Sequence, residues 1–288
     1  MALAVCPSWA LAQQLLATAP AAQSFRLGAF EISVLRDGGL SVPNDGSVFA
    51  QNATPADVAK VLRDAGAETD KIHLDIDALL IRMSGHLVLV DTGYGPAGHG
   101  VLRESLRSAG AAPDDITDIL VTHAHPDHVG GLVDQHGRSA FPKATVRMSA
   151  KEWTFMNSDD GAKTIAAAIK AQIKTFKPGE PILPGITPVA LPGHTPGHVG
   201  YEIVSQGQRM VDVGDMVHSA IVSLATPQWT IKWDSDKALA VATRRSELQR
   251  LAASHELMFA PHFPFPGVGR IEQAGEGFRF RPEVPSDK

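Results

Sequence analysis

Four apolar, strand-like runs of this chain each lead into a side chain that can bind a metal ion. Strand ends are rigid positions, and several of them meeting on one rim would gather such side chains into a single site. The pattern therefore favours a fold in which strand ends share a rim. The runs and the side chains that follow them are residues 119–121 before His123, 187–191 before His194, 210–213 before Asp215 and 257–260 before His262.

The first of these ends is the segment THAHPDH, residues 122–128, which holds three histidines and an aspartate. The chain has only 12 histidines in 288 residues. At that frequency, H-x-H-x-D-H would arise by chance in about one such chain in a thousand. A polar surface loop is the alternative interpretation, and the further histidines and acid downstream favour a metal site over it.

Seven side chains are candidate metal ligands, which is too many for one tetrahedral ion and fits two ions that share a carboxylate. His123 and His125 are two residues apart, so an extended strand end places them on the same side. Imidazole and carboxylate ligands suit zinc, manganese, iron, cobalt or nickel. The candidates are His123, His125, Asp127, His128, His194, Asp215 and His262.

Hairpins are predicted in three places from β-branched runs that flank glycine-containing turns. Residues 78–83 and 86–93 flank Ser84-Gly85, and residues 200–204 and 209–215 flank a second such turn. The third hairpin is expected around residues 30–40. Hairpins interleaved with helices predict stacked sheets with helical covers, in one domain because no low-complexity linker divides the chain.

Helices are predicted from periodic apolar residues and from one capping signal. One follows Gly98 and stops near Gly110, and a short one opens at Ser149, where Ser-x-x-Glu has the form of a capping box, and runs through Trp153. A third is expected from about Asp236 to Ser254. Its apolar side is predicted to hold Ala238, Val241, Ala242, Leu248, Leu251 and Ala252.

The composition is that of an ordinary globular protein, with 44% hydrophobic and 20% charged residues. A net charge of −5 gives no electrostatic footprint for nucleic acid, and no stretch is long and apolar enough to span a bilayer. The single cysteine, Cys6, excludes an intrachain disulfide. The expected partner is therefore a small-molecule substrate, and the oligomeric state stays open, a homodimer included.

The first 25 residues contain no Lys, Arg, Asp or Glu and are rich in alanine. They are interpreted as a signal peptide, with Ala10-Leu11-Ala12 as its cleavage site, or else as a disordered tail. A signal peptide predicts a periplasmic or secreted protein, although this one lacks the usual basic leader region. Without it, the protein is expected in the cytoplasm. Residues 26–288 are then the single catalytic domain.

Taken as a set, these motifs resemble the metallo-β-lactamase-fold hydrolase superfamily over roughly residues 25–282. The resemblance lies in HAHPDH, the GH at His194, the GD at Asp215, the late His262 and the DTG of residues 91–93. The methyl parathion hydrolase and lactonase-like branch is the closer match, on LGAFEISVLRDG, THAHPDHVGGL, PGHTPGH and HFPFPGVGRI. The resemblance implies a four-layer αβ/βα sandwich of two mixed β-sheets flanked by helices, with the site at one edge of the packed sheets.

The resemblance also implies roles for the seven candidates. His123, His125 and His194 would bind the first metal ion, and Asp127, His128 and His262 would bind the second. Asp215 would bridge the two ions, for which zinc is the expected identity. A hydroxide held between the ions would attack a small, fairly apolar ester, lactone or phosphotriester, and one ion would polarise its carbonyl or phosphoryl oxygen.

Other side chains are expected to support the site. Asp91 ends an apolar strand, where a buried carboxylate must be paired, and a ligand histidine is its expected partner. His198 and His218 either line the site or satisfy local backbone groups. Tyr94 is a candidate hydrogen-bond donor to a substrate oxygen, as tyrosines are in lactonase-like relatives. Candidate pocket aromatics are Trp153, Phe155, Trp229, Trp233, Phe263 and Phe265.

Several other functions use related sites. A β-lactamase is disfavoured because Asp215 stands where those enzymes usually carry serine or cysteine, and a thioesterase of the same fold is a further alternative. A redox enzyme with iron, such as a sulfur dioxygenase or a di-iron oxygen reductase, belongs to another class. The di-iron type usually has glutamate at the position of His125. A non-catalytic metal-binding protein is the remaining alternative.

Overall fold

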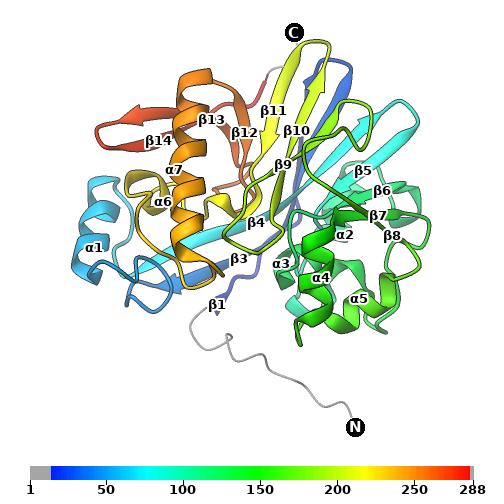
Figure 1. The fold of residues 1–288 in the computed structure, drawn as a ribbon, viewed down its shortest axis with the longest axis horizontal. Helices are drawn as coiled ribbons and strands as arrows, with labels where there is room; N and C mark the ends of the chain where they lie inside the picture. The colour runs from blue at the N-terminus through cyan, green and yellow to red at the C-terminus, as the bar shows by residue number, and fades with distance from the viewer. Residues whose placement is uncertain (1–13, 286–288) are drawn as a thin grey trace.

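The computed structural model describes residues 14–285, which form two β-sheets packed face to face with helices on the outside (Figure 1). The first sheet has the strand order β1-β3-β4-β5-β6-β7-β8, with β2 paired to β3. Its strands are β1 (Gln14–Leu15), β2 (Ala22–Leu27), β3 (Phe30–Pro43), β4 (Lys71–Met83), β5 (His86–Val90), β6 (Asp118–Leu120), β7 (Thr145–Ser149) and β8 (Ile173–Phe176).

The second sheet has the order β14-β13-β12-β11-β10-β9. Both sheets are mixed, because β5 to β8 run parallel in the first and β11 runs parallel to β12 in the second, while the other pairs are antiparallel. The strands of the second sheet are β9 (Ile186–Ala190), β10 (Val199–Ser205), β11 (Gln208–Asp212), β12 (Leu257–Phe259), β13 (Val268–Ala274) and β14 (Gly277–Pro282).

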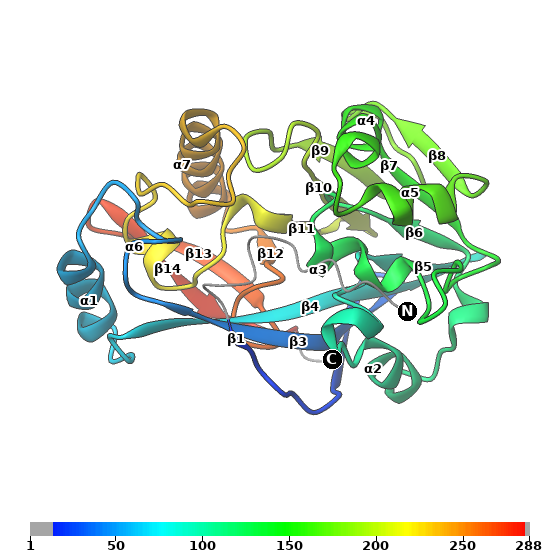
Figure 2. The same cartoon turned by 90° about the horizontal axis from the view of Figure 1, so that it is seen from below.

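Helices cover the outer faces of both sheets, and α7 lies on the side of β13 while α4 and α5 lie beside β7 and β8 (Figures 1 and 2). This is the four-layer sandwich that the sequence predicted. The helices are α1 (Pro55–Asp64), α2 (Leu102–Ser108), α3 (Pro126–Val129), α4 (Ala150–Ser158), α5 (Lys163–Ile169), α6 (Val222–Ala225) and α7 (Lys237–Ser254). Short 3₁₀ turns are η1 (Pro96–Gly98), η2 (Pro113–Asp115), η3 (Gly130–Leu132) and η4 (Gly214–Met216).

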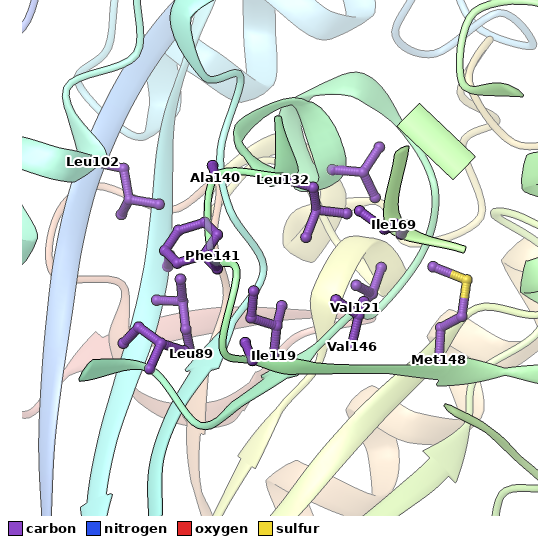
Figure 3. Packing of buried hydrophobic residues seen from close by; sticks show 14 of the residues in the cluster. Leu89, Leu102, Ile119, Val121, Leu132, Ala140, Phe141, Val146, Met148 and Ile169 are labelled. Atoms are coloured by element: carbon purple, nitrogen blue, oxygen red, sulfur yellow. The ribbon is translucent and has the colours of Figure 1, made fainter. Parts of the chain in front are cut away.

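Apolar clusters hold the layers together. Side chains of both sheets, among them Ile81, Tyr201 and Phe259, fill the space between them. On the outer face of the first sheet, Leu89, Ile119, Val146 and other residues form one cluster with side chains of α2, α4 and α5. Figure 3 shows labelled members of this cluster. A third cluster lies between the second sheet and α7, and a fourth lies under α1 at the far ends of β3 and β4. The rim where the strands end is thereby held rigidly.

The two hairpins predicted from paired runs are present as β4–β5 and β10–β11. The third prediction was wrong in detail, because residues 30–40 lie within one strand, β3. The hairpin turn comes just before it, at Gly28-Ala29, and a β-bulge between Arg36 and Gly38 absorbs the polar and glycine residues that suggested a turn.

The three predicted helices are α2, α4 and α7, and α4 extends beyond Trp153 to Ser158. The predicted apolar side of α7 was wrong at Ala238 and Ala242, which are exposed. The buried residues of α7 are Ala240, Arg244, Leu248 and Leu251. The buried stripe therefore includes an arginine, which no pattern of apolar residues can show.

The expected leader or tail over residues 1–25 lies partly outside the described residues, and its cleavage site at residues 10–12 lies wholly outside them. From residue 14 onward the stretch contributes to the first sheet: Gln14 pairs with Ser41, and β2 pairs with β3. Residues 14–15 and 22–25 therefore lie in strands, and the signal peptide stays a prediction. Within residues 14–285, no helix combines the length and the apolar character that a bilayer span requires.

Candidate metal centre

The seven candidate ligands come from both sheets and meet at the rim between them. The first sheet supplies His123 and His125 from the loop after β6, and Asp127 and His128 from α3. The second sheet supplies the rest from segments that follow β9, β11 and β12; these are His194, Asp215 in η4, and His262. Residues far apart in the sequence therefore form one cluster, as their positions at strand ends predicted.

One set of four ligand atoms belongs to His123, His125, His194 and Asp215, and these atoms lie within 4.8 Å of one another. His125 Nδ1 is 3.1 Å from His123 Nε2 and 2.8 Å from His194 Nε2. Asp215 Oδ2 is 3.6 Å from His123 Nε2 and 3.3 Å from His194 Nε2. In a tetrahedral zinc site with bonds of about 2.0–2.1 Å, ligand atoms are about 3.4 Å apart, so the spacing fits a metal ion.

A second set comprises Asp127, His128 and His262. Asp127 Oδ2 is 3.7 Å from His128 Nε2 and 3.5 Å from His262 Nε2. The other oxygen of Asp215, Oδ1, lies 3.1 Å from the Nε2 atoms of both histidines. Oδ2 also lies 3.2 Å from His262 Nε2. The Asp215 carboxylate therefore lies between the two ligand sets, where a bridging carboxylate would lie.

The chemistry of this donor set fits metal ions better than hydrogen bonding within the protein. His128 Nε2 and Asp215 Oδ1 are both buried and only 3.1 Å apart, yet neither has a hydrogen-bond partner among the described residues. Buried polar atoms are normally hydrogen-bonded, so such a pair needs an explanation. Lone pairs that converge on a common point, as they do around an ion, provide one.

The outer nitrogens of four ligand histidines are fixed by neighbouring groups. His128 Nδ1 lies 2.7 Å from Asp91 Oδ2, and His194 Nδ1 lies 3.0 Å from Asp234 Oδ1. His262 Nδ1 donates to the backbone oxygen of Asp75 at 2.8 Å, and His123 Nδ1 is 3.0 Å from Thr122 Oγ1. Such contacts fix the tautomer and direct Nε2 inward.

Asp91 lies at the point where the sequence predicted a paired carboxylate. In addition to His128, it accepts hydrogen bonds from the backbone N–H and the hydroxyl of Thr122, at 2.8 and 2.7 Å. It therefore connects the end of β5 to the start of the ligand loop. Asp234 performs the same task for His194, and no sequence signal marked it.

Burial and the neighbouring carboxylates shift the pKa values of the cluster histidines in opposite directions. Burial lowers the pKa of His123 and of His125 well below the usual value. Burial would do the same at His194, but Asp215 and Asp234 raise its pKa to about 9. At Asp215, burial opposes ionisation, yet the surrounding histidines hold its pKa well below the ordinary range. Metal ions would take over the positive charge that protonated histidines carry in the metal-free protein.

His198 and His218 are both buried beside Asp215. His198 donates from Nδ1 to the backbone oxygen of Leu191 and accepts at Nε2 from the backbone N–H of Asp215, at 2.8 and 2.9 Å. It thus holds the backbone of Asp215. His218 places Nε2 3.1 Å from Asp215 Oδ2, and its ring stacks parallel to that of His262 at 5.5 Å. Both histidines therefore lie against the metal centre.

Glu152 connects the two loops of the first ligand set, a role that sequence reasoning missed. Its Oε1 accepts from the backbone N–H of Ala124 at 2.7 Å. Its Oε2 accepts from the hydroxyl of Thr195 at 2.7 Å and from the backbone N–H of Gly197 at 2.9 Å. The capping signal at Ser149 could have pointed to this glutamate, but only half of that motif forms: Ser149 Oγ accepts from Glu152 N, while the carboxylate turns to the site.

Tyr94 lies on the loop that follows β5, and Asp37 beneath this loop holds it. Asp37 accepts from the backbone N–H groups of Tyr94 and Leu102, at 2.8 and 2.9 Å. Gly93 permits this approach, since a Cβ there would lie 2.2 Å from the Asp37 carboxyl group. Burial, with the charges of Asp127 and Asp215, raises the pKa of the Tyr94 phenol well above its usual value, so its hydroxyl keeps its proton.

The structure separates the predicted pocket aromatics. Trp229 and Trp233 pack with Tyr94 in the cluster under α1, and the Trp233 ring is 5.4 Å from that of His218. Phe263 is 0% exposed and packs against Phe280, so it cannot line an open pocket. The remaining three contact other parts of the core: Trp153 and Phe155 pack with the helices over the first sheet, and Phe265 lies under the guanidinium of Arg36.

Comparisons with known proteins identify the family and the fold. The sequence model of the metallo-beta-lactamase superfamily matches residues 73–262. AidC, a dizinc quorum-quenching lactonase whose structure holds a product, is 29% identical with a TM-score of 0.88, over 93% of this chain and 99% of that chain. The hydrolase AbOPH is also 29% identical, with a TM-score of 0.86 over 94% of this chain and 100% of that chain.

Curated relatives match over shorter regions. Metallo-beta-lactamase domain-containing protein 1 of Xenopus laevis is 35% identical over 108 residues, 38% of this chain and 40% of that protein. Its Mus musculus counterpart is 44% identical over 62 residues, 22% of this chain and 21% of that protein. The aligned region thus spans less than half the length of these two relatives.

Proposed function

The chain belongs to the metallo-β-lactamase superfamily, and on this basis we propose that it is a hydrolase that uses two divalent metal ions to cleave small, fairly apolar lactones. Carboxylic esters and phosphotriesters are further substrates that the same chemistry would accept. The observation that carries the proposal is the Asp215 carboxylate, which lies between two sets of three further ligands and is within 3.3 Å of His194 in one set and of His128 and His262 in the other. The similarity to a dizinc lactonase along nearly the whole chain supports lactones as the first choice.

Zinc is the proposed metal, because the ligand set consists of imidazoles and carboxylates and because AidC is a dizinc enzyme. When bound, two such ions activate a water molecule as the nucleophile and polarise the oxygen of the attacked group. His123, His125 and His194 would hold one ion, Asp127, His128 and His262 the other, and Asp215 both.

The substrate would approach from the side of His125 and Asp127, which are the only partly exposed members of the two ligand sets. The Asp127 side chain is 15% exposed, whereas that of His123 is fully buried. The buried side of the cluster is closed by His198 and Asp91. Water and substrate therefore reach the centre from one direction.

Tyr94 would bind the substrate oxygen on which negative charge develops. Its phenol lies close enough to Asp127 and Asp215 for their charges to raise its pKa, and burial has a larger effect in the same direction. The hydroxyl therefore keeps its proton at neutral pH. A preorganised donor of this kind stabilises a developing oxyanion.

The apolar part of the substrate would lie against an apolar wall formed by Tyr94, Ile221, Trp229 and Trp233. These four side chains are partly buried against the same core cluster. Trp233 also contacts His218, which lies against Asp215. The wall thus begins beside the metal ligands, which supports a fairly apolar substrate.

The test is a substrate panel with protein of defined metal content. Metal-free protein would be reconstituted with two equivalents of zinc and assayed with lactones, aryl esters, phosphotriesters, thioesters and β-lactams. We expect lactone hydrolysis, which is measured through the release of protons. This activity should be absent without metal and restored by zinc. Zinc-loaded protein that hydrolyses no lactone, or activity that needs iron and consumes oxygen, would refute the proposal.

A further inference from the structure

Helix α7 carries an arginine on the side that packs against the second sheet. Arg244 is 1% exposed and shares the buried stripe with Ala240, Leu248 and Leu251. A charge at such a position is costly unless it is paired and hydrogen-bonded. The partners of Arg244 should therefore show why a charged residue occupies the stripe.

The guanidinium of Arg244 makes four hydrogen bonds, all to the segment between β11 and α7. Nε donates to the backbone oxygen of Met216 at 2.9 Å. Nη1 donates to the backbone oxygens of Pro227 and Trp229, at 3.2 and 3.1 Å. Nη2 donates to Asp234 Oδ2 at 3.0 Å. One side chain thus connects three points of a segment that carries part of the metal centre.

Two of these bonds lead directly to metal ligands. Asp234 uses its other oxygen, Oδ1, to contact His194 Nδ1 at 3.0 Å, and Met216 follows the bridging residue Asp215 in the chain. Arg244 therefore contacts His194 through a single intervening residue, Asp234, and it binds the backbone of the residue next to Asp215. His194 and Asp215 both belong to the first ligand set.

We propose that Arg244 is a positioning residue of the metal centre: it fixes Asp234, and through it the ring of His194, together with the backbone beside Asp215. This inference rests on the proposed function, because it assumes that the first ligand set binds a metal ion. A buried Asp234 without Arg244 would lose the donor to Oδ2 and would be free to rotate away from His194. The imidazole would then no longer be held with Nε2 directed inward.

The bond pattern requires a guanidinium in particular. Its planar array of N–H groups reaches acceptors on three sides, whereas an ammonium group is a single compact donor centre. Arg244→Lys therefore keeps the charge but cannot serve the Met216, Trp229 and Asp234 acceptors together. Arg245 provides a matched control, because it is the next residue of the same helix and is exposed.

The experiment measures zinc affinity by competition with a chelator in Arg244→Lys, Asp234→Asn, the double variant and Arg245→Lys. Circular dichroism of the metal-free proteins would identify the folded variants. We expect Arg244→Lys and Asp234→Asn each to weaken the binding of one of the two zinc ions about 10- to 100-fold. The zinc affinity of the double variant should be only slightly below that of the single variant that binds zinc less tightly, because both substitutions act on His194. Arg245→Lys should bind zinc as the wild type does.

Wild-type zinc affinity in folded Arg244→Lys would overturn the proposal, as would fully additive losses in the double variant. If Arg244→Lys does not fold, Asp234→Asn decides, because it leaves the three backbone bonds of Arg244 in place: wild-type zinc affinity there also overturns the proposal. Zinc affinity is measured without substrate, so it tests the role of Arg244 independently of whether the protein hydrolyses lactones. Excess zinc should restore much of the kcat of Arg244→Lys, which a general loss of structure would not allow.

Discussion

Replacement of Glu152 by alanine should destabilise the metal-free protein by about 4 kcal/mol. The side chain accepts hydrogen bonds from two buried backbone N–H groups, of Ala124 and Gly197, and from the hydroxyl of Thr195. A buried donor left without an acceptor costs about 1–3 kcal/mol. Two such donors and one lost hydroxyl bond together give the stated figure, before any effect on metal binding.

Glu152→Gln has the same shape and should cost about half as much. Its amide oxygen can still accept from one N–H group, and its NH₂ group can donate to the Thr195 hydroxyl. One buried backbone donor then remains without an acceptor. The loss in Glu152→Gln relative to the wild type therefore reports the unsatisfied donor, because the side chain keeps its shape.

Scanning calorimetry in the presence of a chelator measures both variants without the contribution of metal. A loss of 1 kcal/mol lowers the melting temperature by about 2–4 °C in a chain of this size, so Glu152→Ala should melt about 8–16 °C below the wild type. The exposed Glu180 provides the control, and Glu180→Ala should change little. The reasoning is refuted if Glu152→Ala melts with the wild type, or if alanine and glutamine cost the same.

Three further outcomes are expected. Asp215→Ala should lower the metal content and abolish hydrolysis. His123→Ala should also lower the metal content, whereas His136→Ala, at an exposed position, should not. Two bound ions with full activity in Asp215→Ala, or equal effects of the His123 and His136 substitutions, would contradict the ligand assignment. Tyr94→Phe should lower kcat about 100-fold with unchanged zinc content, and an unchanged kcat would exclude the role of its hydroxyl. Burial raises the pKa of Asp37 from 3.8 to about 6, so the folded state binds its proton more tightly. The stabilising contribution is therefore full below about pH 4 and should fall by about 3 kcal/mol as the pH rises through 6, relative to Asp37→Asn, in urea unfolding of the metal-free protein. Parallel pH profiles of the two proteins would show that Asp37 does not titrate in this way.

The candidate metal ligands could be found in the sequence because each of them lies next to a local signal. His123 to His128 form one short motif, and His194, Asp215 and His262 each follow a strand-like run. Strand ends converge in any sandwich of this kind, so a one-dimensional pattern was enough to bring the ligands together. The stacked sheets and the main hairpins followed from the same patterns.

The supporting residues could not be predicted, because their partners are distant in the sequence and are often backbone atoms. The three residues that donate to the Glu152 carboxylate lie 28, 43 and 45 positions away in the sequence. The acceptors of Arg244 include three backbone carbonyl oxygens. A carbonyl oxygen has no sequence signature. The same limitation applies to Phe263, whose position beside a ligand in sequence gave no sign that its side chain points into the core. The homodimer and the periplasmic or secreted location stay predictions.

The division of the ligands between the two sheets has a consequence for the order of events during maturation. The complete set extends from His123 to His262, and neither sheet contains it alone. A nascent or partly folded chain can therefore offer an ion only fragments of its binding site. Binding of an ion by a complete set would therefore require the docking of one sheet on the other, so cation uptake would be a late step of assembly.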